Sequence, residues 1–392
     1  MTLGARFLAA LLLAGLSVPL LLGSGSPPAP EQPGRAPAGS GRPALLLGQS
    51  APLSGPSAQL GREFRAGAEA WFAEVNRRGG IHGREVRLIS RDDRYEPELT
   101  VRNTRLLLEQ DRVLALFGYV GTPTTQAVLP LVERDRIPLV APLTGARLLR
   151  EPLRPTVFHL RASYQAEIDR IIHALVRDAR HRIAVVHQDD AFGQDGLAAA
   201  RRALSSHGLQ PVATAAVERN STRVGGAVRT ILAAAPSAVL IVSAYPSSAA
   251  FTRELQQGGS RALVMNVSFV GTRGLQDALG DGPATGIGIT QVVPFPWNRR
   301  VPVVAEYQRL MQRRSPMAPL GFTSLEGFLA ARLITEGLER AGRDPSRPSL
   351  VRALESIRNL DLGGLTLTMG PDDHQASDSV ELTFLGSQRW EP

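Results

Sequence analysis

The stretch VLALFGYVGTPTTQAVLPLVERDRIPLVAP, residues 113–142, places one helix between two apolar strands. Residues 113–120 and 137–142 are short apolar runs typical of buried strands, and residues 123–135 carry apolar side chains at helical spacing. A strand, a helix and a second strand in this order join two parallel strands through a right-handed crossover. The stretch therefore predicts one βαβ unit of an α/β fold.

The same alternation extends in both directions along the chain. A first series occupies residues 44–142 and a second occupies residues 163–293. Near-continuous apolar strands that alternate with helices predict parallel sheets covered on both faces. Two series predict two α/β lobes. The remaining segments are three predicted helices and two predicted strands, at 301–314, 325–342, 349–358, 363–370 and 379–385.

The composition excludes several kinds of chemistry. The chain has 392 residues, no cysteine and no lysine, so all 44 basic residues are arginines. Without cysteine there is no thiol nucleophile and no disulfide, and without lysine there is no phosphate-binding loop of the Walker type and no Schiff base. The net charge is +8, but the arginines are scattered along the chain. We therefore expect no nucleic-acid partner.

The N-terminus has the layout of an export signal. Arg6 precedes an apolar run from Phe7 to Leu22, which small residues follow. This order predicts a signal peptide at residues 1–26, with a retained membrane anchor as the alternative. Residues 27–43 form a Pro/Gly-rich linker with little apolar content, so the folded part is expected to begin near Ala44.

Three strand-to-helix corners in the first series share a polar, small-residue composition. They occupy residues 48–61, 117–126 and 140–149. In a parallel sheet these corners lie together at the carboxyl edge, where open α/β proteins bind ligands. Their hydroxyls and the backbone N–H groups at helix starts suit a small anion such as a carboxylate. The alternative is that these residues only cap their helices.

Catalytic and metal-binding patterns are weak. The nearest candidate for a nucleophile elbow, residues 55–59, lacks its final glycine. The best local metal candidate is one histidine with three following aspartates, for which helix capping is the alternative: His187, Asp189, Asp190 and Asp195. We therefore expect no cofactor, no metal and no enzymatic activity.

Three longer stretches resemble one known family. Residues 51–88, 121–142 and 182–197 are similar to the branched-chain amino-acid type of periplasmic binding protein, the substrate receptor of ABC importers. The resemblance covers roughly residues 44–385 in order. It implies the type I periplasmic binding protein fold, with two doubly wound parallel-sheet lobes that are joined by three crossover segments and close by hinge motion.

The resemblance also implies lobe boundaries. Lobe 1 takes residues 44–161 and 294–365, and lobe 2 takes residues 162–293 and 366–392. The crossings then fall near residues 161–163, 292–294 and 366–370.

Matching positions imply a set of ligand-binding residues. Thr122 matches the hydroxyl-bearing corner that holds a ligand carboxylate, and Leu60 stands where the family has an aromatic residue. The full set is Leu60, Tyr119, Val120, Thr122, Leu143, Thr144, Gly145, Phe192, Tyr245 and Ser268.

Ser268 is the main departure from the family pattern. It stands where the family has the acidic residue that pairs with a ligand ammonium. A buried ammonium without a countercharge is costly. Either another acid such as Glu167 or Asp190 supplies the charge, or the ligand has no ammonium.

The implied function is that of an exported solute receptor in the periplasm. It would bind a small carboxylate- or amide-bearing ligand, such as an amino acid, between its lobes and deliver it to an ABC permease in the inner membrane. A ligand-sensing subunit of a membrane receptor and an exported hydrolase with a carboxylate pair are the alternatives.

Overall fold

The computed structural model describes residues 42–280, 286–314 and 317–386. The predicted signal peptide and nearly all of the predicted linker lie outside these residues. In the part of the chain that is described, no helix is both long and apolar enough to cross a membrane.

The first sheet has five parallel strands in the order β2-β1-β3-β4-β5. The strands are β1 (Leu45–Ala51), β2 (Val86–Asp92), β3 (Ala115–Phe117), β4 (Leu139–Val140) and β5 (Val157–Phe158). Its helices are α1 (Ala58–Arg77), α2 (Pro97–Glu109), α3 (Thr122–Arg134), α9 (Pro302–Arg314), α10 (Phe322–Arg340) and α11 (Arg347–Glu355). We call this sheet with its helices lobe 1. The stretch quoted first supplies β3, α3 and β4, so the predicted βαβ unit is confirmed.

The second sheet has six strands in the order β13-β10-β9-β8-β6-β7. The strands are β6 (Ile183–Gln188), β7 (Thr214–Val217), β8 (Ala238–Val242), β9 (Leu263–Asn266), β10 (Ile287–Gln291) and β13 (Glu381–Phe384). Its helices are α4 (Tyr164–Arg177), α5 (Ala191–Ser205), α6 (Gly225–Ala234), α7 (Tyr245–Gln257) and α8 (Thr272–Leu279). We call this sheet with its helices lobe 2. The strand β13 pairs antiparallel with β10, so the expectation of purely parallel sheets is wrong at this edge.

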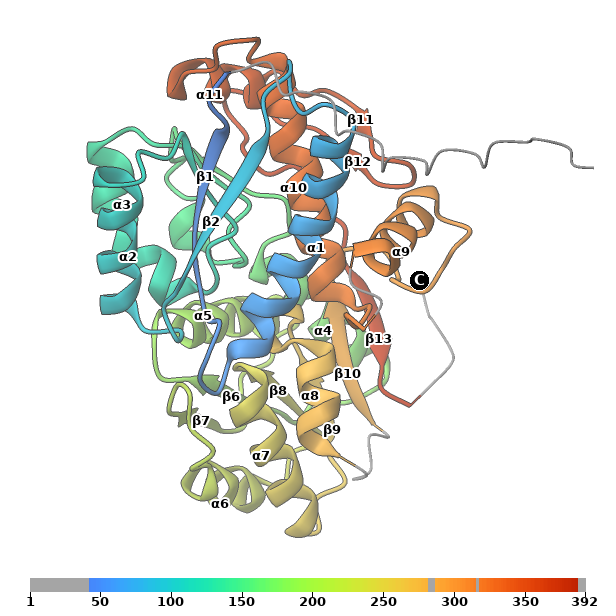
Figure 1. The fold of residues 1–392 in the computed structure, drawn as a ribbon. Helices are drawn as coiled ribbons and strands as arrows, with labels where there is room; N and C mark the ends of the chain where they lie inside the picture. The colour runs from blue at the N-terminus through green and yellow to red at the C-terminus, as the bar shows by residue number, and fades with distance from the viewer. Residues whose placement is uncertain (1–41, 281–285, 315–316, 387–392) are drawn as a thin grey trace, which may run out of the picture. The chain divides into compact units, whose positions relative to one another are not determined.

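Helices α1 and α10 pack against each other at very short range (Figure 1). A Cβ atom on Gly67 of α1 would lie 1.7 Å from the carbonyl oxygen of Ser324, and one on Gly327 of α10 would lie 1.9 Å from that of Phe64. Only glycine permits this approach. It brings the start of α10 next to the first strand-to-helix corner, where α1 begins.

Segments that join the two sheets run beside each other. His159 donates its backbone N–H to the carbonyl of His374 at 2.8 Å, and Ala376 donates to the carbonyl of His159 at 2.8 Å. The chain just before the first predicted crossing is therefore hydrogen-bonded to the chain just after the third. A short antiparallel pair, β11 (Leu360–Asp361) and β12 (Thr366–Leu367), precedes the return to lobe 2.

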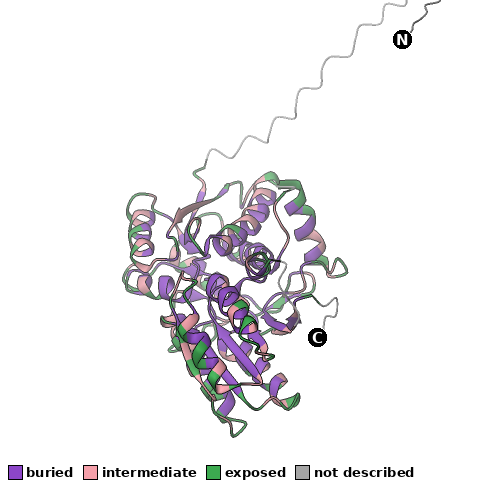
Figure 2. Ribbon diagram, turned by 90° about the horizontal axis from the view of Figure 1, so that it is seen from below, coloured by how far each residue is buried: buried purple, intermediate pink, exposed green. Residues whose placement is uncertain are grey.

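Burial follows the layered arrangement. Strands β3, β6 and β8 are buried at every position, and most helices bury one face and expose the other, whereas α10 is buried along most of its length (Figure 2). This pattern is that of sheets covered on both faces.

Candidate functional site

Two of the polar corners of lobe 1 are joined by a hydrogen bond. Thr122 begins α3, Thr144 follows β4, and their hydroxyl oxygens lie 2.7 Å apart. The backbone N–H of Ala146 also donates to the Thr144 hydroxyl at 3.2 Å. Both threonines are fully buried. The corners predicted to share a sheet edge therefore do meet.

Aromatic rings of both lobes pack beside these corners. Phe192 of α5 lies 5.0 Å from Tyr164 and 4.8 Å from Phe269, measured between ring centroids. Tyr95 of lobe 1 lies 6.0 Å from Phe269 of lobe 2. All four side chains are buried.

A small cavity remains between the lobes, which we call the interlobe cavity. Its volume is about 10 Å³, room for about one water molecule. Its walls come from both lobes and from the segment after β10. The lining residues are Leu60, Leu143, Arg161, Ser268, Phe269, Gln291, Val292, Val293, Phe322, Thr323 and Glu326.

Arg161 and Glu326 form an ion pair in the wall of this cavity. Nε of Arg161 lies 3.0 Å from Oε1 of Glu326, and Nη2 donates to Oε2 at 3.3 Å. The same Nη2 donates to the hydroxyl of Ser268 at 2.5 Å. Arg161 is 1% exposed and Glu326 is 4% exposed. The pair is therefore shielded from solvent and interacts strongly.

Burial and neighbouring charges shift the pKa values of both partners. Burial, only partly offset by Arg161, raises the pKa of Glu326 to about 7. Burial alone would lower the pKa of Arg161, but the carboxylates of Glu326 and Glu167 outweigh it and raise that pKa. Arg161 therefore stays charged, and Glu326 is an acid that can change its charge near neutral pH.

The predicted site residues divide into three groups. Leu60, Leu143 and Ser268 line the interlobe cavity. Thr122, Thr144, Gly145 and Phe192 lie in the buried layer beside Tyr164, whose backbone N–H donates to the carbonyl of Gly145 at 2.8 Å. The third group is Tyr119, Val120 and Tyr245, none of which lines this cavity.

The third group has other contacts. The Tyr119 hydroxyl lies 2.8 Å from that of Thr104 on α2, and Val120 forms an isolated bridge with Leu143. Tyr245 stands at the start of α7, and its hydroxyl donates to the carbonyl of Pro56 in the other lobe. Tyr245 therefore joins the two lobes at their rim.

Neither of the two acids suggested in place of the family's acidic residue at Ser268 is available to pair with a ligand ammonium. Glu167 accepts hydrogen bonds from the backbone N–H of Ser268 at 2.7 Å, from its hydroxyl at 3.0 Å and from the Thr290 hydroxyl at 2.6 Å. Asp190 caps α5 by accepting from Phe192 and Gly193. The acid that reaches the cavity is Glu326, which the sequence prediction missed.

The metal candidate does not form a cluster. Asp190 caps its helix, and Asp195 accepts from the backbone N–H of Arg147. Among the residues that the structure describes, no group of three or more potential ligands is arranged to hold a metal ion. Asp190 therefore has the capping role that was the alternative.

Hydrogen bonds across the rim hold the lobes together. Ser57 donates to the side-chain oxygen of Asn220 at 2.8 Å, and Arg219 donates to Glu96 at 2.8 Å. Deeper, Gln188 of lobe 2 donates to the Tyr95 hydroxyl at 3.3 Å. The structure therefore has the lobes closed on each other.

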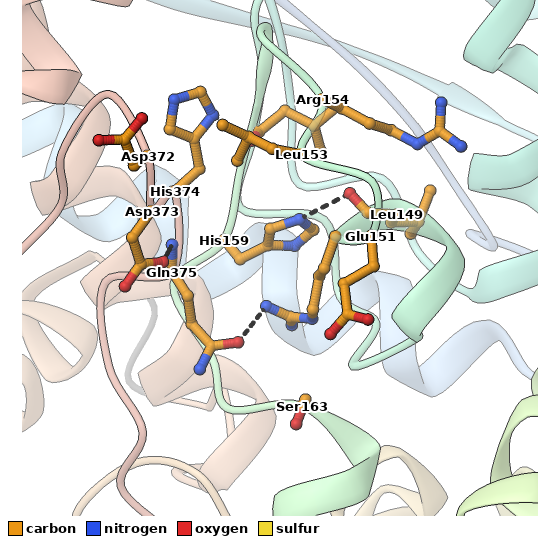
Figure 3. Close-up of a pocket in the computed structure, with 12 residues that line it drawn as sticks. Leu149, Glu151, Leu153, Arg154, His159, Ser163, Asp372, Asp373, His374 and Gln375 are labelled. Atoms are coloured by element: carbon orange, nitrogen blue, oxygen red, sulfur yellow. Dashed lines mark hydrogen bonds between the residues drawn. The ribbon is translucent and has the colours of Figure 1, made fainter.

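A second cavity, of about 410 Å³, lies beside the crossing segments, and we call it the crossing cavity. Residues 149–163 face residues 372–375 across it (Figure 3). Arg150 donates from Nη1 to the side chain of Gln375 at 2.6 Å and from Nη2 to the carbonyls of Thr144, Arg161 and Ala162 at 3.2–3.4 Å. Arg150 thus connects the corner at Thr144 to residues 161–162 and to Gln375.

Sequence features pointed weakly to the residues that the prediction missed. Arg161 follows an apolar strand in FHLRAS, and Glu326 interrupts the apolar segment FTSLEGFLAA. A charged residue inside an apolar run is a signal of a buried charge that needs a partner. Nothing in the local pattern shows that these two residues meet.

Comparisons with known proteins agree with the architecture. A family model described as periplasmic binding protein matches residues 46–386. The Leu/Ile/Val-binding protein homolog 3 of Brucella melitensis is 25% identical over 345 residues, which cover 86% of this chain and 90% of that protein.

Two solved structures are similar over most of the chain. One is a possible leucine/isoleucine/valine-binding protein from Rhodopirellula baltica, with 33% identity, a TM-score of 0.86 and coverage of 91% of this chain and 98% of that one. The other is a substrate-binding periplasmic protein from Ralstonia solanacearum, with 35% identity, a TM-score of 0.83 and coverage of 87% and 98%.

These matches confirm the family resemblance and the predicted fold class. The family consists of binding proteins rather than enzymes, and its name implies a periplasmic location. The chain belongs to the periplasmic binding protein family, as a leucine-binding-like member.

Proposed function

We propose that this chain is the exported solute receptor of an ABC importer. It binds a small carboxylate- or amide-bearing ligand, such as an amino acid, between its lobes and delivers it to a membrane permease. The observation that carries this proposal is the interlobe cavity, in whose wall a buried arginine, a buried glutamate and a serine from three separate segments converge.

The donors around the cavity support an acidic or amide ligand. The Arg161 guanidinium forms strong charge-assisted hydrogen bonds with carboxylates. The hydroxyls of Thr122 and Thr144 lie in the adjoining corners. Apolar walls, including Leu60, Leu143 and Phe322, suit an aliphatic or aromatic ligand body.

Entry of a ligand requires the lobes to separate. The cavity of about 10 Å³ cannot hold an amino acid, and rim contacts such as Ser57–Asn220 close it. Opening about the crossing segments would break those contacts and expose the site. A ligand that contacts both lobes shifts the balance toward closure, and the closed form is the one a permease recognises.

The names of the relatives support an amino-acid ligand. The relatives at 24–25% identity include Leu/Ile/Val-binding protein homologs from Brucella species. Delivery to a permease rests on the same relationship. A ligand-sensing subunit of a membrane receptor would use the same cavity, and the membrane partner distinguishes the two functions.

The proposal is tested by thermal unfolding of the full chain with the twenty protein amino acids, their deaminated acids and the corresponding amides. We expect at least one compound to raise the melting temperature in a concentration-dependent manner, because a ligand that binds only the folded state stabilises it. If no compound of the three classes changes the melting temperature, the proposed function is wrong.

A further inference from the structure

Among the described residues of its wall, the interlobe cavity has one ionisable base and one ionisable acid. Among the described residues that line it, Arg161 and Glu326 are the charged ones. Glu167 lies behind Ser268, and its two oxygens already accept three hydrogen bonds. A ligand in this cavity therefore meets one cation and one anion.

The hydrogen-bond capacity of Arg161 is not fully used. Nη2 donates to Ser268 and Glu326, and Nε lies against Glu326, but Nη1 is buried without a hydrogen-bond partner. The hydroxyl of Tyr164 is also buried without a partner of good geometry, and it lies close enough to Arg161 to affect its pKa. An unpaired buried donor costs free energy. These two groups can recover that free energy from a ligand oxygen.

Charge balance then limits the kind of ligand. Arg161 and Glu326 neutralise each other, and Glu167 adds a negative charge close by. A carboxylate ligand without a positive charge would place a further anion beside two buried acids, which is unfavourable in a poorly solvated site. A ligand that carries an N–H donor with its carboxylate brings no net charge and can engage both partners.

We propose that Arg161 and Glu326 act together as the specificity element of the site and select ligands that carry an oxygen acceptor and an N–H donor without net charge, zwitterionic α-amino acids above all. The ligand carboxylate binds Nη1 of Arg161 and the Tyr164 hydroxyl, and the ligand ammonium binds Glu326. This inference rests on the proposed function. It places the missing countercharge on α10 of lobe 1 rather than at Ser268.

The test compares matched ligands on matched variants by titration calorimetry. The ligands are leucine, isoleucine and valine, with 4-methylpentanoate, 3-methylpentanoate and 3-methylbutanoate as their ammonium-free counterparts. For the wild-type chain we expect at least one amino acid to bind about tenfold or more tightly than its counterpart, because only the zwitterion pairs with both charges.

Glu326→Gln removes the anion and keeps the size of the side chain. We expect amino-acid affinity to fall by about tenfold or more, while affinity for the ammonium-free acid stays equal or rises, since Arg161 loses its competing partner. Substitution of a residue that only supported the fold would lower the affinity for both ligands. Glu63→Gln is the matched control, because Glu63 is also buried with a pKa raised to about 7 but does not line the cavity.

A second variant, at Arg161, tests the proposal independently of Glu326→Gln. Arg161→Lys retains a positive charge without the planar guanidinium. We expect Arg161→Lys to lower the affinity for both amino acids and ammonium-free acids and to keep the preference for the amino acid. Its melting temperature without ligand shows whether it is folded.

The outcomes separate this inference from the proposed function. Two outcomes would contradict the role of Arg161 and Glu326 as the specificity element but leave the proposed receptor function standing. In the first, amino acids bind and Glu326→Gln does not change the preference for them over ammonium-free acids. In the second, the wild-type chain prefers ammonium-free acids. If the broad panel of amino acids, acids and amides gives no binding at all, the receptor function itself is wrong.

Discussion

The two cavities use buried arginines in different ways. In the interlobe cavity, Arg161 is paired with a carboxylate and still has an unpartnered Nη1. In the crossing cavity, Arg150 directs both terminal nitrogens to carbonyl and amide oxygens of the chain. The crossing cavity is far larger, about 410 Å³ against about 10 Å³. A terminal nitrogen, Nη1, is without a partner in Arg161, whereas in Arg150 only Nε lacks one.

The pKa values of the two arginines also shift in opposite directions. Carboxylates raise the pKa of Arg161 against the effect of burial. Burial and the nearby charge of Arg161 lower the pKa of Arg150 to about 10. Neighbouring carboxylates therefore favour the charged form of Arg161, whereas Arg150 donates to the carbonyls of Thr144, Arg161 and Ala162 and to the side chain of Gln375.

The largest expected effect comes from breaking the ion pair. Arg161→Met should lower the free energy of unfolding by about 3–5 kcal/mol at pH 8, because it leaves Glu326 buried without its partner. Urea unfolding measures this change. The double variant Arg161→Met with Glu326→Leu should recover part of the loss, since no unpaired charge remains. A double variant as unstable as the single one would show that the ion pair is not the cause.

The two cavities should give opposite dependences of stability on pH. Glu326, faced by Arg161, Glu167 and Arg150, has a pKa raised from 4.5 to about 7, so the folded chain holds its proton more tightly than the unfolded chain. The contribution of Glu326 to the free energy of unfolding is fully present below about pH 4.5. It is lost as the pH rises through 7, by up to about 1.4 kcal/mol per pH unit.

His159 in the crossing cavity has the opposite sign. Burial, first, and Arg150 lower its pKa well below 6.5, so stability falls as the pH drops below about 6.5. Urea unfolding between pH 5 and 8 should show that Glu326→Gln removes the first slope and His159→Gln removes the second. Unchanged slopes in both variants would contradict the assignment.

Removing the arginine of the crossing cavity should reduce stability without changing ligand preference. Arg150→Met deprives the carbonyls of Thr144, Arg161 and Ala162 of a donor, and we expect a loss of about 1–3 kcal/mol. Arg154→Met is the matched control, since Arg154 lines the same cavity but ties only Leu148 and Glu133. A change in the preference between amino acid and ammonium-free acid in Arg150→Met would place Arg150 in the specificity element.

The linked threonine corners should contribute to ligand affinity. Thr122→Val keeps the shape and removes the hydroxyl, and we expect binding to weaken by about 1–2 kcal/mol. Titration calorimetry measures the change. Thr125→Val is the control, because the Thr125 hydroxyl donates only to the carbonyl of Gly121. Equal affinities in the two variants would remove Thr122 from the site.

The smallest expected effect is at the rim. Tyr245→Phe removes the hydrogen bond from the Tyr245 hydroxyl to Pro56, and we expect apparent ligand affinity to fall by about 0.5–1.5 kcal/mol through less favourable closure. The dissociation rate in stopped-flow experiments should rise accordingly. If only the association rate changes, Tyr245 does not stabilise the closed form.

Local sequence patterns were enough to predict most of the strands and helices and the polar corners, although β5 was not among the predicted strands. The unit at residues 113–142 forms β3, α3 and β4 as predicted, because buried strands and amphipathic helices have local apolar periods. The corners at Thr122 and Thr144 meet because parallel strands end at one edge of their sheet. The antiparallel pairing of β13 was not predicted, because the sequence of a short strand does not show whether it runs parallel or antiparallel to its neighbour.

The pairing of the buried charges depends on the fold of the whole chain. Arg161 and Glu326 are 165 positions apart and come together between the lobes, while Glu167 and Asp190 are occupied by local hydrogen bonds. Seven of the ten predicted site residues do not line the interlobe cavity. Strand and helix patterns depend on neighbours along the chain, whereas the pairing of buried charges depends on how distant segments pack, and that is set by the whole fold.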